Sequence, residues 1–204
     1  MKKIILIMFA ALLSANVASA QDFKGFLSDV KYNLSVGLTI TGCDKEYDQN
    51  RLGWGLGLDA QKPILHYPND ASTIYGLVGL HLDKKGGKNT TDFMAMLEDD
   101  DAYLSATHLK IPVHAGFTYQ FSKISLFIDL GPYFAFKVGG NTPQNVETSS
   151  MELGYGFMFG VKFKRFAFAF GNDQGLTNFA TLTSGEDKTN MKNTTGHLDL
   201  RWTL

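Results

Sequence analysis

The sequence predicts an all-β protein: an eight-stranded antiparallel up-and-down transmembrane β-barrel with long outer loops and short periplasmic turns. Three observations predict this fold. Apolar and polar residues alternate in eight segments, and the links between the segments alternate between short and long. The apolar residues of these segments are also too bulky to fit inside a narrow eight-stranded barrel.

The first twenty residues have the pattern of a secretory signal peptide. Lys2 and Lys3 give a basic start, residues 4–13 form a short apolar run, and residues 18–20 form an A-x-A cleavage site. The apolar run is too short to cross a membrane as a helix. The sequence therefore predicts a signal peptide over residues 1–20 and a barrel domain over residues 21–204, exported to the cell envelope.

Strict alternation of apolar and polar residues defines the expected strands, as in residues 32–41. A side chain on every second position of a strand lies on the same face, so each such segment has one apolar and one polar face. The segment 73–83 is less clear, because Tyr75 and Leu77 sit on the parity opposite to Val78. The expected strands are 32–41, 52–60, 73–83, 108–121, 124–138, 151–163, 166–170 and 197–204.

The links between these strands alternate in length, which is typical of a membrane barrel with short turns at one rim and long loops at the other. Within one long link, residues 91–97 have helical spacing after a capping residue, which predicts a short helix. Pro112 and Pro132 lack the N–H that a ladder needs, which predicts bulges at both. The short links are 61–72, 122–123 and 164–165, and the long links are 42–50, 84–106, 139–150 and 172–192.

Alternation alone fits either a soluble barrel with an apolar interior or a membrane barrel with an apolar exterior. Volume favours the membrane barrel, because an eight-stranded interior has no room for rows of aromatics such as Phe157 and Phe159. The apolar parity of the five clearest strands also lacks charged residues, which cost about 2–4 kcal/mol at the lipid midplane. Aromatic residues near strand ends match the girdles at lipid headgroups: Tyr32, Trp54, Tyr119 and Trp202.

The polar parity is expected to line the lumen, where it carries ionisable groups of both signs among many glycines. Buried charges must be paired, so these residues predict a structural salt-bridge network. A proton or ion path is the functional alternative, but an interior of this size leaves little bore for a general porin. The expected network is Asp59, Lys110, His114, Asp129, Lys137, Glu152, Lys162, Asp199 and Arg201, with Lys164 on the same parity.

Catalysis and metal binding are two alternatives to a purely structural role for the charged residues. Residues His108, His114 and Asp129 could converge with Ser105 or Ser125 as a lipid hydrolase, but every strand histidine has lumen parity. The acidic run 98–101 could attract calcium, but it lacks the spaced oxygen ligands and glycine of an EF-hand loop and is better explained as a solvated loop tip. The sequence therefore predicts a protein that is not an enzyme and has no cofactor or metal site.

Function is expected in the loops or on the barrel wall. Phe93, Met94, Met96 and Leu97 have no role in the strand pattern, so they are predicted to plug the barrel mouth or to contact a partner. The expected partners are outer-membrane lipid, the outer-membrane assembly machinery and a surface or secretion-system protein. Nucleic acid is not expected, because 19 basic residues are balanced by 20 acidic ones.

Four short motifs add a family resemblance that extends over nearly the whole chain after the signal peptide. The motifs are residues 109–112 (LKIP), 119–121 (YQF), 130–133 (LGPY) and 174–178 (QGLTN). With the signal peptide, they resemble the PorT-like outer-membrane β-barrel family of Gram-negative bacteria. The resemblance implies a small barrel without an assigned activity in most members, and one member of that family assists a secretion system.

Overall fold

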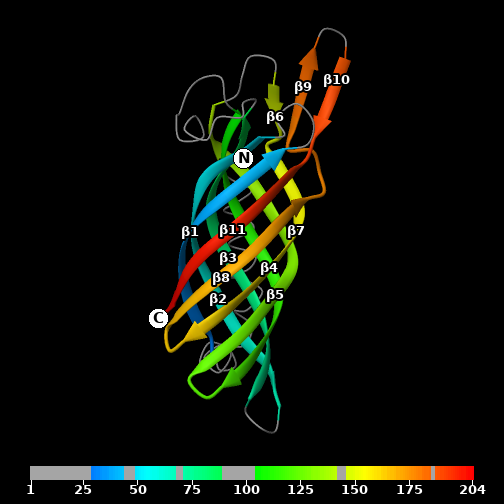
Figure 1. The fold of residues 1–204 in the computed structure, drawn as a ribbon. Helices are drawn as coiled ribbons and strands as arrows, with labels where there is room; N and C mark the ends of the chain where they lie inside the picture. The colour runs from blue at the N-terminus through cyan, green and yellow to red at the C-terminus, as the bar shows by residue number, and fades with distance from the viewer. Residues whose placement is uncertain (1–28, 44–48, 68–70, 89–103, 142–145, 185–186) are drawn as a thin grey trace. The chain divides into compact units, whose positions relative to one another are not determined.

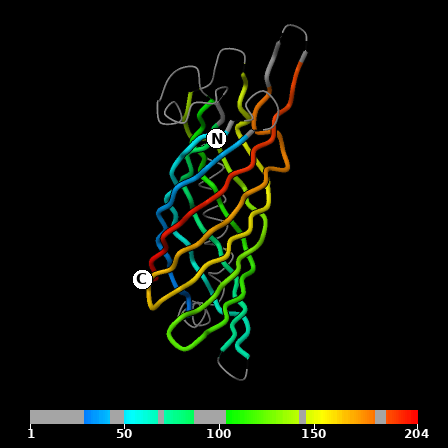
Figure 2. The backbone as a smooth tube through the Cα atoms, in the orientation of Figure 1, coloured from blue at the N-terminus to red at the C-terminus, as the bar shows by residue number. Residues whose placement is uncertain are grey.

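Eight long strands close into one antiparallel barrel in the computed structural model (Figure 1; Figure 2). The structure describes residues 29–43, 49–67, 71–88, 104–141, 146–184 and 187–204. The barrel strands are β1 (Lys31–Cys43), β2 (Gln49–His66), β3 (Ser72–Lys88), β4 (Leu104–Phe121), β5 (Ile124–Gly139), β7 (Met151–Phe163), β8 (Phe166–Gly175) and β11 (Asn193–Thr203). Within these ranges, no helix is long and apolar enough to cross a membrane.

Each barrel strand pairs with its neighbours in the order β1-β11-β8-β7-β5-β4-β3-β2. The barrel closes because β1 also pairs with β11, from Asn33 opposite Thr203 to Cys43 opposite Asn193. Closure removes both sheet edges and lets neighbouring strands satisfy their backbone groups, which lipid requires. The predicted fold class is confirmed. The signal peptide over residues 1–20 and the helix over residues 91–97 lie outside the described residues.

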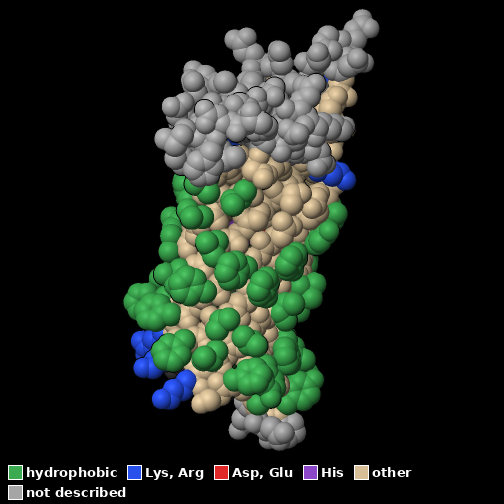
Figure 3. Space-filling view, viewed as in Figure 1, with side chains coloured by type: hydrophobic (Ala, Val, Ile, Leu, Met, Phe, Trp, Pro, Cys, Tyr) green, Lys and Arg blue, Asp and Glu red, His purple; other side chains and the backbone are tan. Residues whose placement is uncertain are grey.

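The apolar parity faces outward and the polar parity faces inward. Along β1, Leu34, Val36 and Leu38 are 42–53% exposed, whereas Asn33 and Thr39 are at most 6% exposed. Figure 3 shows apolar side chains spread over the wall, with Lys and Arg confined to its two ends on this face. This arrangement is the reverse of a soluble barrel, whose apolar residues would line the interior.

The unclear parity of β3 is explained by two large side chains inside the barrel. Tyr75 and Leu77 are 2% and 3% exposed, and they share the inner face with His81 and Asp83. The strand is therefore regular, and Tyr75 belongs inside because its hydroxyl donates a hydrogen bond to Asp129.

The other inward aromatic rings are accommodated by glycine on the facing strand. Tyr133 lies opposite Gly154, and a Cβ at that glycine would be 2.4 Å from the tyrosine ring. Phe127 and Tyr75 lie in the same way opposite Gly160 and Gly116. A further glycine run, Gly53-x-Gly55-x-Gly57, occupies the inner face of β2, where a Cβ at Gly57 would be 2.7 Å from His81. Lumen glycines therefore act as spacers for larger lumen side chains.

Several links contain more strand than predicted. The link 61–72 is largely strand, because β2 continues to His66 and β3 begins at Ser72. The long links 139–150 and 172–192 contribute a separate three-stranded sheet in the order β10-β9-β6. Its strands are β6 (Val146–Thr148), β9 (Ala180–Ser184) and β10 (Asp187–Met191). The polar sequence of these links shows no apolar alternation and so gave no sign of these strands.

The predicted bulges at Pro112 and Pro132 are wrong. Pro112 pairs with Tyr133, and the register resumes unchanged at Ala115 opposite Leu130. The missing N–H groups cost ladder hydrogen bonds without adding a residue to either strand. The register shifts elsewhere. In the pairing of β2 with β3 it shifts between residues 50 and 55 and between residues 63 and 65 of β2, and in the pairing of β4 with β5 it shifts between residues 107 and 108 of β4.

The two shortest turns share one end of the barrel with the chain's C-terminus. Ser122 and Lys164, each the first residue of a two-residue turn, have positive φ angles of 51° and 55°. Beside the second turn, the Thr203 N–H donates to the Arg165 carbonyl at 2.8 Å. We call this the turn end, and we call the opposite end, which carries the β6–β9–β10 sheet, the loop end.

Candidate functional site: the charged interior of the barrel

The barrel interior holds the ionisable residues that the sequence assigns to it. Asp59, Asp129 and Glu152 are at most 1% exposed, and Lys110 is 3% exposed. Asp199 and Arg201 are also buried, whereas His114, Lys137 and Lys162 are half-buried on the inner face. Charges this deeply buried require partners, and the structure supplies them in three groups.

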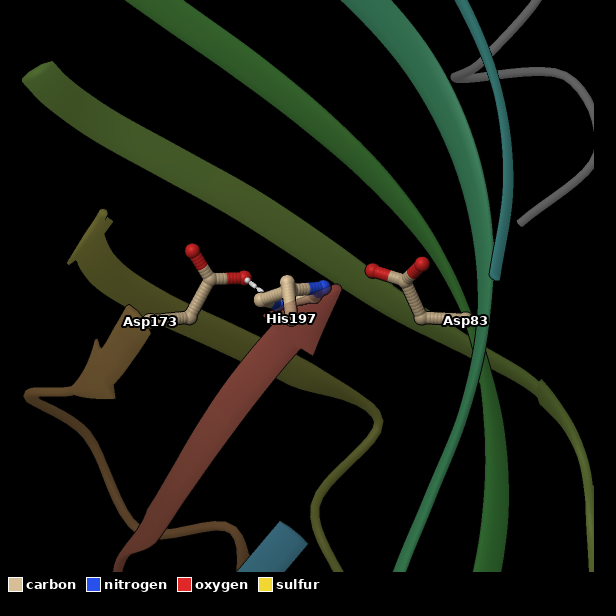
Figure 4. A group of neighbouring side chains, drawn as sticks. All are labelled: Asp83, Asp173 and His197. Carbon is tan, nitrogen blue, oxygen red and sulfur yellow. Dashed lines mark hydrogen bonds and ion pairs between the residues drawn. The ribbon is translucent and has the colours of Figure 1, made fainter. Parts of the chain in front are cut away.

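The central group is organised by one lysine. The Lys110 ammonium lies 2.8 Å from Asp83 Oδ2 and 2.7 Å from Asp173 Oδ2, so it bridges two carboxylates from opposite sides of the lumen. His197 Nε2 lies 2.9 Å from the same oxygen of Asp173. Figure 4 shows His197 directed at Asp173, with Asp83 on the other side of the imidazole.

The donor atoms of Asp83, Asp173 and His197 lie within 4.8 Å of one another, a spacing that could hold a metal ion. Two carboxylates and an imidazole suit several divalent metals. However, the Lys110 ammonium contacts both carboxylates, so a cation already stands where a metal would bind. Both carboxylates of the cluster are therefore already engaged by the lysine, as in a structural ion-paired group.

The group nearer the turn end joins Arg201 to Asp129. Arg201 Nη1 donates to Asp129 Oδ2 at 2.9 Å, while the other carboxylate oxygen accepts from Tyr75. The guanidinium also lies 5.5 Å from the centre of the Phe127 ring, a cation–π distance. Close by in the interior, His81 Nε2 and Asp59 Oδ1 are 2.7 Å apart.

The group nearer the loop end centres on Glu152. Its Oε1 accepts from Lys85 at 3.2 Å and from the Tyr133 hydroxyl, and its Oε2 accepts from Asn193 at 2.5 Å. The Lys85 ammonium also lies 5.0 Å from the centre of the Tyr133 ring. Glu152 is thereby fully surrounded by donors, which a buried carboxylate needs.

An apolar cluster lies beyond this group at the loop end. Phe179 is fully buried and its ring centre is 5.6 Å from that of the lumen residue His108. The Phe179 N–H donates to the Met191 carbonyl at 2.8 Å, which ties the cluster to the small sheet. We call it the apolar cap; its members are Leu104, Ala106, Val146, Phe179, Ala180 and Met191. The predicted plug residues Phe93, Met94, Met96 and Leu97 and the acidic run 98–101 lie outside the described residues.

Three predicted network members differ from these groups. His114 Nε2 has no hydrogen-bond partner among the described residues, and Lys137 and Lys162 donate to hydroxyls rather than to carboxylates. Lys137 donates to the Thr148 hydroxyl near the loop end, and Lys162 donates to Thr203 Oγ1 at 2.7 Å near the turn end. Lys164 is exposed at the turn itself. Five of the predicted residues, Asp59, Lys110, Asp129, Glu152 and Arg201, therefore lie in ion pairs inside the barrel, whereas Lys137 and Lys162 lie toward its two ends.

The residues of the hydrolase alternative do not converge. Ser125 lies opposite Gln120 of β4. Gln120 is six residues from His114 on that strand, which corresponds to about 20 Å at roughly 3.3 Å per residue. Ser105 lies nearer to His108, about 10 Å along β4, but Asp129 lies opposite Gly116, about 26 Å along β4 from His108. Asp129 is engaged by Tyr75 and Arg201.

Sequence reasoning missed several members of these groups. Lys85 and Asp173 fall in expected links, and Asp83 is the last residue of the expected strand 73–83, whose parity is unclear. His81 and His197 stand at positions of lumen parity, and that parity was the signal that could have found them. Phe179 and Met191 were isolated apolar residues in a polar link, a pattern that is weak by itself.

A closed eight-stranded antiparallel barrel with lipid-type residues outside and paired charges inside defines a small membrane β-barrel of the outer-membrane class. The family comparison agrees: residues 19–181 match the model of the outer membrane protein beta-barrel domain. The chain belongs to this family, and it is an outer-membrane protein. The comparison with curated protein sequences gave no match.

Solved barrels are similar in fold at low sequence identity. The outer membrane enzyme PagL matches with a TM-score of 0.52 and 13% identity, over 83% of this chain and 98% of PagL. Ail, the attachment invasion locus protein of Yersinia pestis, matches with a TM-score of 0.42 and 15% identity, over 86% of this chain and 99% of Ail. Neisserial surface protein A matches with a TM-score of 0.39 and 10% identity, over 85% and 97%. At these identities the likeness concerns the fold alone.

Proposed function

We propose that the protein is a closed, non-catalytic outer-membrane barrel that acts as an interaction protein of the envelope. The observation that carries this proposal is the β6–β9–β10 sheet at the loop end, which stands apart from the barrel ladder. Among the described residues, β10 pairs with β9 alone, so its other edge is open to an added strand. An edge strand of this kind can bind an extended segment of another protein through backbone hydrogen bonds.

The apolar cap makes this sheet a suitable docking element. Phe179, Ala180 and Met191 are completely buried, so the base of the β9–β10 hairpin is fixed to the loop end. Lys188 and Asn190 on β10 are exposed. A fixed edge loses less entropy on binding than a mobile loop would, which favours affinity.

The resemblance to PorT-like barrels supports one kind of partner, a component of a secretion or assembly apparatus. In that family one member assists a secretion system, so a component of a secretion or assembly apparatus is the partner we propose. The absence of catalysis is supported by the separation of the serines from His114 and by the pairing of Asp129 with Arg201. Membrane insertion after removal of residues 1–20 completes the proposed route to the envelope.

Shortening the hairpin should remove partner binding while leaving the barrel folded. The variant replaces residues 182–189 with a two-residue Asn-Gly turn, which keeps the apolar cap residues of β9 and β10. We expect crosslinked partners recovered from native envelopes to fall at least tenfold, because the β10 edge is lost. Heat-modifiable migration in detergent should be unchanged, since the barrel ladder contains none of the deleted residues.

A side-chain variant provides the matched control. Replacing Lys188 and Asn190 with alanine keeps the backbone edge, so partner recovery should fall less than twofold. An unchanged set of partners in the shortened variant would contradict the proposal. Partner loss in the alanine variant alone would contradict recognition through the strand edge.

A further inference from the structure

A cavity of about 620 Å³ opens at the turn end of the barrel. It is lined by residues from the ends of all eight barrel strands, and its neutral polar groups include Asn33, Gln61, Thr118 and Thr203. This volume is in the range of small-molecule sites. Short turns face the periplasm in barrels of this class, so the cavity opens to the periplasm.

The charged side chains of this cavity are basic. Lys31, Lys123, Lys162 and Lys164 line it, and none of its described lining residues is Asp or Glu. Arg201 forms part of the lining as well, but its guanidinium is paired with Asp129. The cavity is therefore concave and carries an excess of positive charge, which concentrates anions.

Lys162 is bonded differently from the lysines in the middle of the barrel. Lys85 and Lys110 contact carboxylates, whereas Lys162 donates to Thr203 Oγ1 at 2.7 Å. That hydroxyl in turn donates to Asn33 Oδ1 at 2.7 Å, and Asn33 donates to Gln61 at 3.4 Å. The chain of neutral groups fixes the position of Lys162 without supplying a negative charge.

Lys31 lines the same cavity as Lys162, and its positive charge acts unfavourably on that of Lys162. Two ammonium groups that line one cavity repel each other, and an anion bound between them would relieve that repulsion. An oxyanion between them would accept charge-assisted hydrogen bonds from both, and these are roughly twice as strong as neutral ones.

We propose that the turn-end cavity binds a phosphate-bearing small molecule, with Lys31 and Lys162 as its main ligands and Lys123 and Lys164 at the entrance. Several lysines favour a ligand with more than one negative charge. The volume leaves room for a group larger than phosphate itself, against the amides and hydroxyls of the lining. The phosphate could belong to a soluble periplasmic compound or to the headgroup of an inner-leaflet lipid.

Binding of pyrophosphate to the full chain tests this proposal. The protein is folded in zwitterionic detergent, and pyrophosphate binding is measured by calorimetry at low salt. We expect Lys31→Gln/Lys162→Gln to weaken binding at least tenfold. Lys137→Gln is the matched control, because Lys137 is also a lumen lysine bonded to a threonine hydroxyl, but near the loop end. It should bind as the unmodified protein does.

Nanodiscs distinguish the two sources of phosphate. If discs containing phosphatidylglycerol weaken pyrophosphate binding relative to phosphatidylcholine discs, the cavity accepts a lipid headgroup; equal binding assigns it to soluble phosphate compounds. Absence of pyrophosphate binding, or equal binding by the unmodified protein and the double variant, would overturn the proposal. A loss of pyrophosphate binding in Lys137→Gln equal to that in the double variant would overturn it as well. Heat-modifiable migration of each variant verifies that the barrel is folded.

Discussion

Replacing Lys110 with methionine should lower the free energy of unfolding by about 3–5 kcal/mol, the typical cost of removing one partner from a buried ion pair. The effect should be large because one ammonium bridges Asp83 and Asp173, at 2.8 Å and 2.7 Å. Without it, two carboxylates face each other in a site from which water is largely excluded. Urea unfolding of the protein in lipid vesicles, followed by tryptophan fluorescence, measures the change.

Two further variants show whether the loss comes from the stranded charges. Lys137→Met should cost less, about 1–3 kcal/mol, because Lys137 donates to a threonine hydroxyl and leaves no carboxylate behind. Adding Asp83→Asn and Asp173→Asn to the Lys110 variant should restore part of the stability, because neutral amides need no counter-charge. A Lys110→Met protein as stable as the unmodified one would show that this group does not hold the barrel together.

Replacing Phe157 with arginine should prevent or strongly reduce assembly into lipid. Phe157 is 45% exposed on the outer face of β7, and arginine near the lipid midplane costs about 2–4 kcal/mol. The measurement is the fraction of protein that becomes heat-modifiable after folding into vesicles. Phe157→Leu is the control and should assemble normally, because it keeps an apolar side chain toward lipid.

The same pair of variants separates membrane from soluble behaviour. On a soluble barrel, an outward arginine would be hydrated and harmless. Equal assembly of the arginine and leucine variants would therefore contradict a lipid-facing position for Phe157.

The barrel strands were largely predictable because lipid imposes a strict rule on them. Every outward position must be apolar, so alternation such as that of residues 32–41 is almost free of exceptions. Strand ends were less predictable: β2, β3 and β4 extend beyond the expected segments, where lipid no longer selects the outward residues. The β6–β9–β10 sheet was missed for the same reason.

The interior was predictable in composition but only partly in its pairing. Parity placed Asp129 and Arg201 inside, but the strand order around the barrel was needed to bring them together across 72 residues of sequence. The bridge from Lys110 to Asp173 likewise joins β4 to β8, which are not neighbours in the barrel. The reach of the side chains and the stagger of the strands around the barrel decide which charges meet across the lumen. The alternation of apolar and polar residues determines neither.

The central claim is that ion-paired groups and the apolar cap close the interior, so that the barrel does not conduct. Single-channel recording of the purified protein in a planar lipid bilayer tests it most directly. We expect no stable conductance steps from the unmodified protein, because Lys85, Lys110 and Arg201 each bind carboxylates inside the bore, and Phe179 lies over its loop end. Large, stable and reproducible current steps would contradict the closed barrel and support a channel instead.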